Sequence, residues 1–218
     1  MPRPSARERL MDCAEALFAD HGLEAVSLRT INAEAGLSPA ALHYHFRTRE
    51  NLVEALLDRR MRPLMARRRE IFRRLRAADE PVSVRDVIEV LIRPLVEFML
   101  EDPEAGRRYV RFLARLEADG GMNRDFASKR YRGAVVHVGP LLRAALPGLT
   151  SRERRTRVDL AMDFMLRGLA GWAGTIDGPG RASPPLEDFS RSLLDFLVGG
   201  LEAEPSNRST GRLFRISA

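Results

Sequence analysis

Apolar residues recur at the spacing of α-helices along nearly the whole chain, and the alternation typical of strands is almost absent. The first predicted helix begins with a capping box formed by Ser5 and Glu8, and it ends near Gly22. The apolar face of this helix carries Leu10, Ala14, Leu17 and Phe18. The pattern therefore predicts an all-α protein that begins with an amphipathic helix.

Three further helix starts follow within the first fifty residues. Ser27 begins a second, short helix, and Gly36-Leu37-Ser38 forms a tight connection to a third. Ser38 is the predicted N-cap of that third helix, whose first residue is Pro39, and Thr48 begins a fourth helix. Two short helices joined by a tight turn and braced by a longer first helix are typical of a helix-turn-helix.

After residue 50 the predicted helices become longer. We expect bends or kinks at Pro63, Pro94 and Gly139-Pro140, and a loop in the segment 177–185, which is rich in glycine and proline. The long helices are predicted at about 49–76, 83–101, 102–117, 123–146, 151–174 and 186–201. The predicted organisation is a helix-turn-helix domain at residues 1–49, a larger helical domain at residues 50–202 and a mobile tail at residues 203–218.

The third helix divides its residues between two faces, at roughly 100° per residue. Leu42 and Phe46 fall on the core side together with His45, which we interpret as a packed structural histidine. The opposite face carries Ala40, His43, Tyr44 and Arg47. A small residue, an imidazole, a phenol and a guanidinium on one surface suit the major groove of DNA, where they can reach phosphates and base edges.

Neighbouring segments supply candidates for contacts with the phosphate backbone. Arg29 and Thr30 lie on the second helix, although Arg29 could instead pair with Glu34. Thr48 and Arg49 lie at the start of the fourth helix, where free backbone amides can bind a phosphate. The predicted DNA-binding residues are Arg29, Thr30, Ser38, Pro39, Ala40, His43, Tyr44, Arg47, Thr48 and Arg49.

The charge distribution adds little to this prediction. Basic residues outnumber acidic ones by 36 to 30, which gives a net charge of +6 that is compatible with nucleic acid but does not establish it. Every basic residue except Lys129 is an arginine, a bias that a high-GC genome also produces. The excess is concentrated in Arg59–Arg76, where Glu70 is the only acidic residue. We expect this run to be a solvated helix face rather than a second nucleic-acid site.

Other functional classes find no support in the sequence. The chain has no apolar stretch long enough to span a membrane and no apolar signal core, and its one cysteine, Cys13, fits a reducing cytosol. We therefore expect a cytoplasmic protein with no membrane partner, in which Cys13 is a small packed residue. Motifs of hydrolases, phosphate-binding loops and zinc sites are missing, and His43 and His45 splay apart on a helix. We expect no enzyme activity, no cofactor and no metal.

The N-terminal segment from about Arg7 to Leu57 resembles the tetracycline-repressor (TetR) family of bacterial transcription regulators. The likeness includes Val26-Ser27-Leu28-Arg29-Thr30-Ile31, Ala35-Gly36-Leu37-Ser38 and Leu42-His43-Tyr44-His45-Phe46. The family usually has alanine where Asn32 stands, an aromatic residue where His43 stands and lysine where Arg49 stands. The resemblance implies a homodimeric, all-helical repressor that binds palindromic operator DNA and whose larger domain binds a small inducer.

The larger domain offers candidate residues for that inducer. Aromatic and apolar side chains dispersed over several predicted helices could line a pocket, or could form ordinary core. The candidates are Phe98, Tyr109, Phe112, His137, Phe164, Met165 and Trp172, with His137 orienting a polar ligand group or packed as a core histidine. The segments 92–95 and 102–104 resemble regulators that sense fatty-acid-like molecules. Because the helices of this domain are apolar in composition and no dense charge cluster surrounds them, we expect a mostly apolar inducer.

The last two predicted helices are the expected dimer interface. The resemblance places the interface of the homodimer at about 151–174 and 186–201. Gly168, Gly171 and Gly174 recur every three residues in the first of these segments and permit close helix approach, either to a partner subunit or within one chain.

The resemblance and the predicted helices together imply a mechanism. The helix-turn-helix domains of two subunits would bind half-sites about one DNA turn apart, roughly 34–36 Å. An inducer that moves the fourth helix would change that separation and favour the DNA-free state. The alternatives are an all-helical protein-interaction scaffold without DNA binding and an enzyme of unfamiliar type in a helical bundle. Specific DNA binding separates the regulator from both.

Overall fold

The structure is a computed structural model that describes residues 4–78, 80–118, 138–175 and 183–205. Helices make up the secondary structure of these residues, as the sequence predicts, and no strand occurs among them. The helices are α1 (Ala6–His21), α2 (Leu28–Glu34), α3 (Ala41–Phe46), α4 (Arg49–Ala77), α5 (Val84–Glu101), α6 (Pro103–Ala118), α8 (Gly139–Ala145), α9 (Ser151–Thr175) and α10 (Leu186–Glu202).

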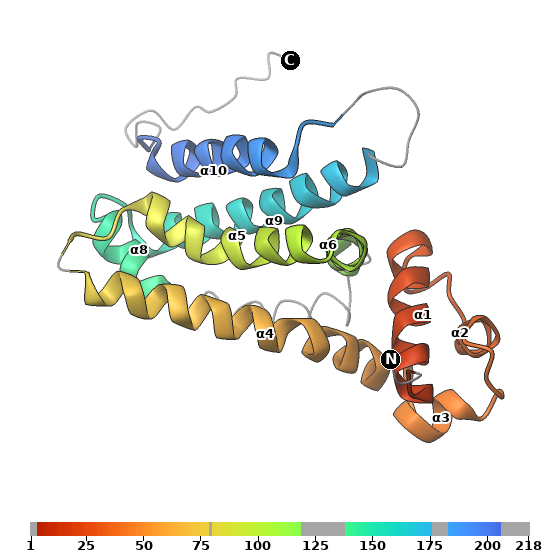
Figure 1. Cartoon of the computed structure of the whole chain (residues 1–218). Helices are drawn as coiled ribbons and strands as arrows, with labels where there is room; N and C mark the ends of the chain where they lie inside the picture. Colours follow the sequence, from red (N-terminus) through yellow and green to blue (C-terminus); the bar gives the residue numbers. More distant parts are fainter. Residues whose placement is uncertain (1–3, 79, 119–137, 176–182, 206–218) are drawn as a thin grey trace, which may run out of the picture.

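The molecule has two parts that meet at the start of α4. Figure 1 shows α1, α2 and α3 gathered at one end of the molecule, while α4 extends from them along the underside of the remaining helices. Helices α5 and α9 lie above α4 in this view, and α10 covers them. Helix α6 is seen end-on beside α1 and contacts it directly. The small N-terminal unit is therefore held by both α4 and α6.

Most predicted helix boundaries are confirmed because the capping residues act as the sequence indicates. Ser5 and Glu8 form a complete capping box on α1, and Ser27 and Thr48 accept hydrogen bonds from backbone amides of the helices that they begin. Helix α4 continues through Pro63 for 29 residues. Helix α5 likewise has the predicted Ser83 as its N-cap, here in a capping box with Asp86, and it continues as one helix through Pro94.

The start of the third helix is an exception. The predicted N-cap Ser38 and first residue Pro39 lie in a turn, and α3 begins only at Ala41. The backbone N–H of Ala41 donates to the carbonyl of Ser38 at 3.0 Å, which closes the turn before helical bonding starts. The N-cap position belongs to Ala40, whose side chain has no capping group. The observed start of α3 therefore lies two residues after the start that the serine–proline pair predicts.

Three other predicted segments are only partly described. The predicted helix 123–146 is seen only from residue 138, and a helix begins there at Gly139 with Val138 as its N-cap. The first part of that predicted helix, residues 123–137, lies outside the described residues. Most of the predicted tail, residues 206–218, and most of the predicted loop 177–185 also lie outside them.

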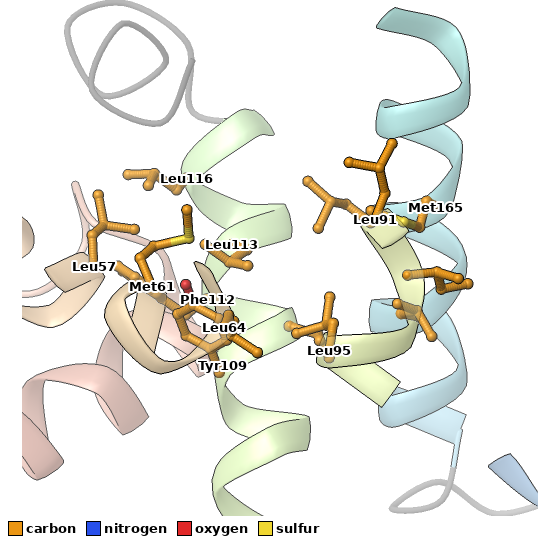
Figure 2. Packing of buried hydrophobic residues seen from close by; sticks show 14 of the residues in the cluster. Leu57, Met61, Leu64, Leu91, Leu95, Tyr109, Phe112, Leu113, Leu116 and Met165 are labelled. Carbon is orange, nitrogen blue, oxygen red and sulfur yellow. The ribbon is translucent and has the colours of Figure 1, made fainter. Parts of the chain in front are cut away.

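The core joins the two parts without interruption. Figure 2 shows apolar side chains of α4, α5, α6 and α9 converging on one another, among them Leu64, Leu95, Leu113 and Met165. The ring of Phe18 in α1 stacks on Phe112 in α6 with centroids 6.2 Å apart, so the N-terminal unit shares this core. Within the described ranges, no helix combines the length and the apolar character needed to cross a membrane.

The arginine run of α4 is not the uniform solvated face that the sequence predicts. Arg68 is buried and donates to the backbone carbonyl of Leu91 at 3.0 Å, and Arg67 pairs with Glu101 of α5. Arg59 and Arg60 pair with α1. The prediction is wrong for these four residues because they lie on the side of α4 that meets other helices. It holds for the exposed Arg62, Arg69, Arg73, Arg74 and Arg76.

Candidate nucleic-acid interface

Helix α3 presents the two faces that its sequence predicts. Leu42 is 1% exposed and Phe46 is also buried, whereas Tyr44 is 83% exposed and His43 is exposed beside it. His45 is half-buried, and its ring meets that of Tyr44 edge-on with centroids 5.1 Å apart. The buried side chains of Leu42 and Phe46 thus orient the imidazole and the phenol toward solvent. This arrangement leaves both rings able to enter a groove of a duplex.

The imidazole of His43 is oriented by a backbone group. Its Nδ1 lies 3.1 Å from the carbonyl oxygen of Arg47, which can only accept, so the ring nitrogen donates there. In the neutral imidazole, Nε2 is then the acceptor. Arg47 itself has a positive φ of 64°, uncommon for a residue with a side chain, and it ends α3. The bond to Arg47 therefore leaves Nε2 as the ring nitrogen of His43 that is available to another molecule.

The remaining predicted DNA-binding residues surround α3. Arg29 and Thr30 are exposed on α2, and Thr48 is exposed at the start of α4. Ser38, Pro39, Ala40 and Arg47 are exposed at the two ends of α3. Arg49 differs, because it is half-buried and its guanidinium donates to the carbonyl of Leu23. A guanidinium held in this way has less freedom to reach a phosphate than the exposed Arg29.

Two asparagine side chains contact the backbone at the ends of α3. Asn32 of α2 is buried and bonds to backbone groups around the start of α3, and Asn51 of α4 donates to the carbonyl of Phe46 at 2.9 Å. The sequence marks Asn32 only as a departure from a family alanine, and its bonding partners are visible only in the structure.

The junction between the N-terminal unit and the larger domain contains a buried carboxylate. Glu15 of α1 is fully buried, and its Oε2 lies 2.7 Å from Nη2 of Arg59 and 3.0 Å from Nη2 of Arg60. Burial disfavours the charged guanidinium of Arg60, but the Glu15 carboxylate outweighs burial and raises the pKa of Arg60. The guanidinium of Arg60 also lies over the ring of Phe98 in α5, 5.2 Å from its centroid.

Cys13 of α1 fits the expected packed residue. It is half-buried, and burial, together with the carboxylates of Glu34 and Asp12, raises the pKa of its thiol. A raised pKa keeps the thiol protonated and poorly nucleophilic at neutral pH. Within the described ranges, no three His, Cys, Asp or Glu side chains gather as metal ligands would.

The structure does not bring the predicted inducer residues together into one pocket. Phe98, Tyr109 and Phe112 form a row of neighbouring rings, with centroids 6.2 and 6.4 Å apart, inside the packed core. Met165 is buried near this core, where Figure 2 shows it beside Leu91. His137 lies outside the described residues.

Two of the predicted inducer residues lie elsewhere. Phe164 is 49% exposed and stacks on Phe196 at the molecular surface, so its placement in an inner pocket is wrong. Trp172 is half-buried, packs near Phe189 and donates from Nε1 to the carbonyl of Pro184 at 2.9 Å. The apolar pattern of α9 does not reveal which of its faces meets the chain's own core.

A cleft of about 640 Å³ lies between α4 and α5, and none of the inducer candidates that the structure describes lines it. Its lining includes the apolar residues Ile71 and Leu75 and charged side chains of both signs. A second cavity of about 440 Å³ lies between α1 and the first half of α4. The sequence does not predict either cavity, because the lining residues become neighbours only through the packing of helices.

The fold and this interface define a two-part helical regulator with an N-terminal helix-turn-helix. Residues 10–56 match the family model described as "Bacterial regulatory proteins, tetR family", and residues 89–200 match "Tetracyclin repressor-like, C-terminal domain". The chain belongs to the TetR family of transcriptional regulators. The resemblance of the sequence is thus confirmed, and membership of a family of regulators supports the expectation that the chain is not an enzyme.

Curated relatives match mainly the N-terminal part. The transcriptional repressor KstR2 of Mycolicibacterium smegmatis is 40% identical over 53 residues, which cover 24% of this chain and 26% of that protein. KstR2 of Mycobacterium tuberculosis is 39% identical over 31% of this chain and 34% of its own length. AcnR of Corynebacterium glutamicum is 31% identical over 56% of this chain and 53% of its own length. The chain therefore matches about a quarter to a half of each of these relatives.

Solved structures share the fold across most of the chain. FadR of Bacillus subtilis, in complex with stearoyl-CoA, has a TM-score of 0.64 at 16% identity and covers 88% of this chain and 97% of its own. The ketosteroid regulator KstR2 of Mycobacterium tuberculosis has a TM-score of 0.58 at 22% identity and covers 93% of this chain and 98% of its own. At these identities the likeness establishes the fold alone.

The buried carboxylate at the junction leads to a stability prediction. Glu15→Ala should lower the free energy of unfolding by about 3–5 kcal/mol, because two guanidinium groups lose the carboxylate that balances their burial. Asp12→Ala removes an exposed partner of the same Arg59 and should cost less than about 1 kcal/mol. Urea denaturation followed by circular dichroism measures both, and equal losses would contradict the role given to Glu15.

Proposed function

We propose that the chain is a ligand-responsive transcriptional repressor that binds palindromic operator DNA as a homodimer and is released by a small, mostly apolar inducer. The observation that carries DNA binding is the outward face of α3, where Tyr44 and His43 are exposed above buried Leu42 and Phe46. A short helix that follows a helix and a tight turn is the element that helix-turn-helix proteins place in the major groove.

Residues around α3 divide by chemistry into two kinds of contact. His43, Tyr44 and Ala40 are the proposed base-reading residues, since an imidazole acceptor, a phenol and a methyl group each match a feature of base edges. Arg29, Thr30, Ser38, Pro39, Arg47, Thr48 and Arg49 are the proposed backbone-contacting set. Arg29 and Arg47 supply exposed positive charge, and Thr48 lies at the free amides of the first turn of α4.

Tyr44→Ala tests this assignment directly. The variant should bind a duplex selected by the wild-type protein from a random pool about tenfold more weakly, because one base-edge contact contributes on the order of 1–3 kcal/mol. Its unfolding free energy should change by less than about 0.5 kcal/mol, since the side chain is exposed. Fluorescence anisotropy measures the affinity, and Leu100→Ala, an exposed substitution on α5, is the control. Unaltered affinity of the Tyr44 variant would refute the contact.

The proposed dimer interface is the outer face of α9 and α10. Leu160, Phe164 and Phe196 are exposed there at 64%, 49% and 61%, and the rings of Phe164 and Phe196 stack with centroids 4.7 Å apart. Exposed aromatic rings in contact on neighbouring helices are typical of a surface that another subunit covers. Two copies related by a two-fold axis would pack these helices as a four-helix bundle.

The glycines of α9 contribute to different contacts. A Cβ at Gly168 would lie 3.5 Å from Leu193 of α10, so this glycine faces the chain's own helix. Gly171 and Gly174 have open space where a Cβ would stand. Close approach of a partner is therefore proposed at these two positions and not at Gly168.

Phe164→Arg should convert a dimer into a monomer, because a guanidinium placed against the apolar face of the second copy would be buried without a partner. Light scattering at micromolar concentration should give about twice the 24.5 kDa chain mass for the wild type and about 24.5 kDa for the variant. Leu100→Arg on α5 is the matched control and should leave the mass of the dimer unchanged. A wild-type protein that is itself monomeric would contradict the proposal.

The inducer is proposed to insert among the apolar side chains of the larger domain. The proposed contacts of the inducer are Phe98, Tyr109, Phe112 and Met165 of the packed core, with Trp172 and His137 as further candidates. FadR of Bacillus subtilis forms a complex with stearoyl-CoA and KstR2 is a ketosteroid regulator, so two proteins of this fold are associated with molecules that carry a large apolar group. A molecule that separates α4 from α6 would act on α1 through the Glu15 ion pairs and the Phe18–Phe112 stack.

A thermal-shift screen tests the class of inducer. Fatty acids, acyl-CoA esters and sterols should include compounds that raise the melting temperature, whereas small, highly charged metabolites should not. A ligand at 100 times its Kd stabilises the folded state by about 2.7 kcal/mol, which such a screen detects. Each stabilising compound should also weaken binding to the selected duplex. Stabilisation by small, highly charged metabolites alone would contradict an inducer with a large apolar group.

A further inference from the structure

Helix α3 lacks the features that hold a helix in place by itself. It has six residues, its N-cap Ala40 makes no side-chain capping bond, and Arg47 ends it with a positive φ. A helix this short is unstable in isolation, since the few hydrogen bonds do not offset the ordering of its first turn. Its first amides also have no partners within the helix. The direction of α3 must therefore be set by groups outside it.

Asn32 of α2 supplies the missing cap at the start of α3. Its side-chain oxygen Oδ1 accepts the backbone N–H of Leu42 at 3.1 Å, which is one of the amides that lack a partner within α3. Its nitrogen Nδ2 donates to the carbonyl of Pro39 and to the carbonyl of Leu28, both at 3.1 Å. The residue is 3% exposed, so it has no route to DNA. One amide thus connects α2, the turn and α3.

Asn51 of α4 bonds to the C-terminal end of α3. Its Nδ2 donates to the carbonyl of Phe46 at 2.9 Å, the last residue of α3. Carbonyls at the end of a helix lack intrahelical donors. The Phe46 carbonyl also accepts the backbone N–H of Thr48 at 2.8 Å, so Asn51 adds a second donor, from a side chain of α4, to this end of α3. Its own backbone N–H donates to Oγ1 of Thr48 at 3.2 Å, which keeps Asn51 in the first turn of α4. The two ends of α3 are therefore bonded to different neighbouring helices.

We infer that Asn32 and Asn51 are positioning residues that set the orientation of α3 and thereby the sequence specificity of DNA binding. This inference rests on the proposed DNA-binding function. Hydrogen bonds to base edges require close geometry, whereas attraction between arginines and phosphates tolerates small changes of direction. Loss of either asparagine should therefore reduce discrimination between DNA sequences more than it reduces binding to DNA in general.

The test compares three variants on two duplexes. One duplex is selected by the wild-type protein from a random pool, and the other has the same composition in scrambled order. Asn32→Ala and Asn51→Ala should each weaken binding to the selected duplex about tenfold, comparable to the loss of one base contact, and change binding to the scrambled duplex less than about threefold. Ser27→Ala removes the N-cap of α2 without touching α3 and is the control for general weakening of the headpiece. Its ratio of the two affinities should stay at the wild-type value.

Hydrogen exchange measured by NMR provides an independent readout without DNA. The Leu42 amide should exchange faster in Asn32→Ala and at the wild-type rate in Ser27→Ala. Asn51 is exposed, so its variant folds even if the Asn32 variant does not. Equal losses on both duplexes, or an unchanged Leu42 amide in a folded Asn32 variant, would overturn the inference. Failure of the wild-type protein to select any duplex would instead refute the proposed function. The exchange experiment would then still test whether Asn32 stabilises the start of α3.

Discussion

A six-residue helix cannot maintain its own direction in water, and the proposed DNA-facing surface of this protein is such a helix. Its orientation comes from its surroundings: Leu42 and Phe46 are buried in the core of the N-terminal unit, and side-chain amides of α2 and α4 bond to its ends. Because these supports come from different helices, a displacement of α3 alone would break contacts with each of them. The exposed rings of His43 and Tyr44 are consequently positioned by the packing of the whole N-terminal unit.

The N-terminal unit is attached to the larger domain by two contacts of different character. The stack of Phe18 on Phe112 is apolar and joins α1 to α6, while Glu15 is paired with Arg59 and Arg60 and joins α1 to α4. A buried ion pair gains little net stability over apolar packing, but it tolerates few alternative arrangements. The junction can thus transmit a displacement of α4 or α6 to α1, as the proposed response to an inducer requires.

The sequence predicts local features of this protein well. The capping residues Ser5, Ser27, Thr48 and Ser83 predict helix starts that the structure confirms, because a cap depends only on neighbours three residues away. The two faces of α3 also follow from helical periodicity alone. The start of α3 was predicted wrongly because its cap is Asn32, a residue distant in sequence that the local pattern around Ser38 does not reveal.

Features that depend on packing between helices were less predictable. Arg68 and Phe164 both occur in regular helical patterns, yet the arginine is buried and the phenylalanine is at the surface. Periodicity shows that a helix has an apolar face, but not whether that face meets the chain's own core or a second copy. The cleft between α4 and α5 was missed for the same reason.

Recognition of DNA by α3 is tested most directly by hydrogen–deuterium exchange of the whole chain with and without a duplex that it has selected. Binding should slow exchange of backbone amides within residues 28–51, which comprise α2, α3 and the first turn of α4. Amides in the exposed arginine segment near Arg73 and Arg74 should exchange at the same rate in both samples. Protection confined to that arginine segment, with none in α3, would contradict recognition by this helix.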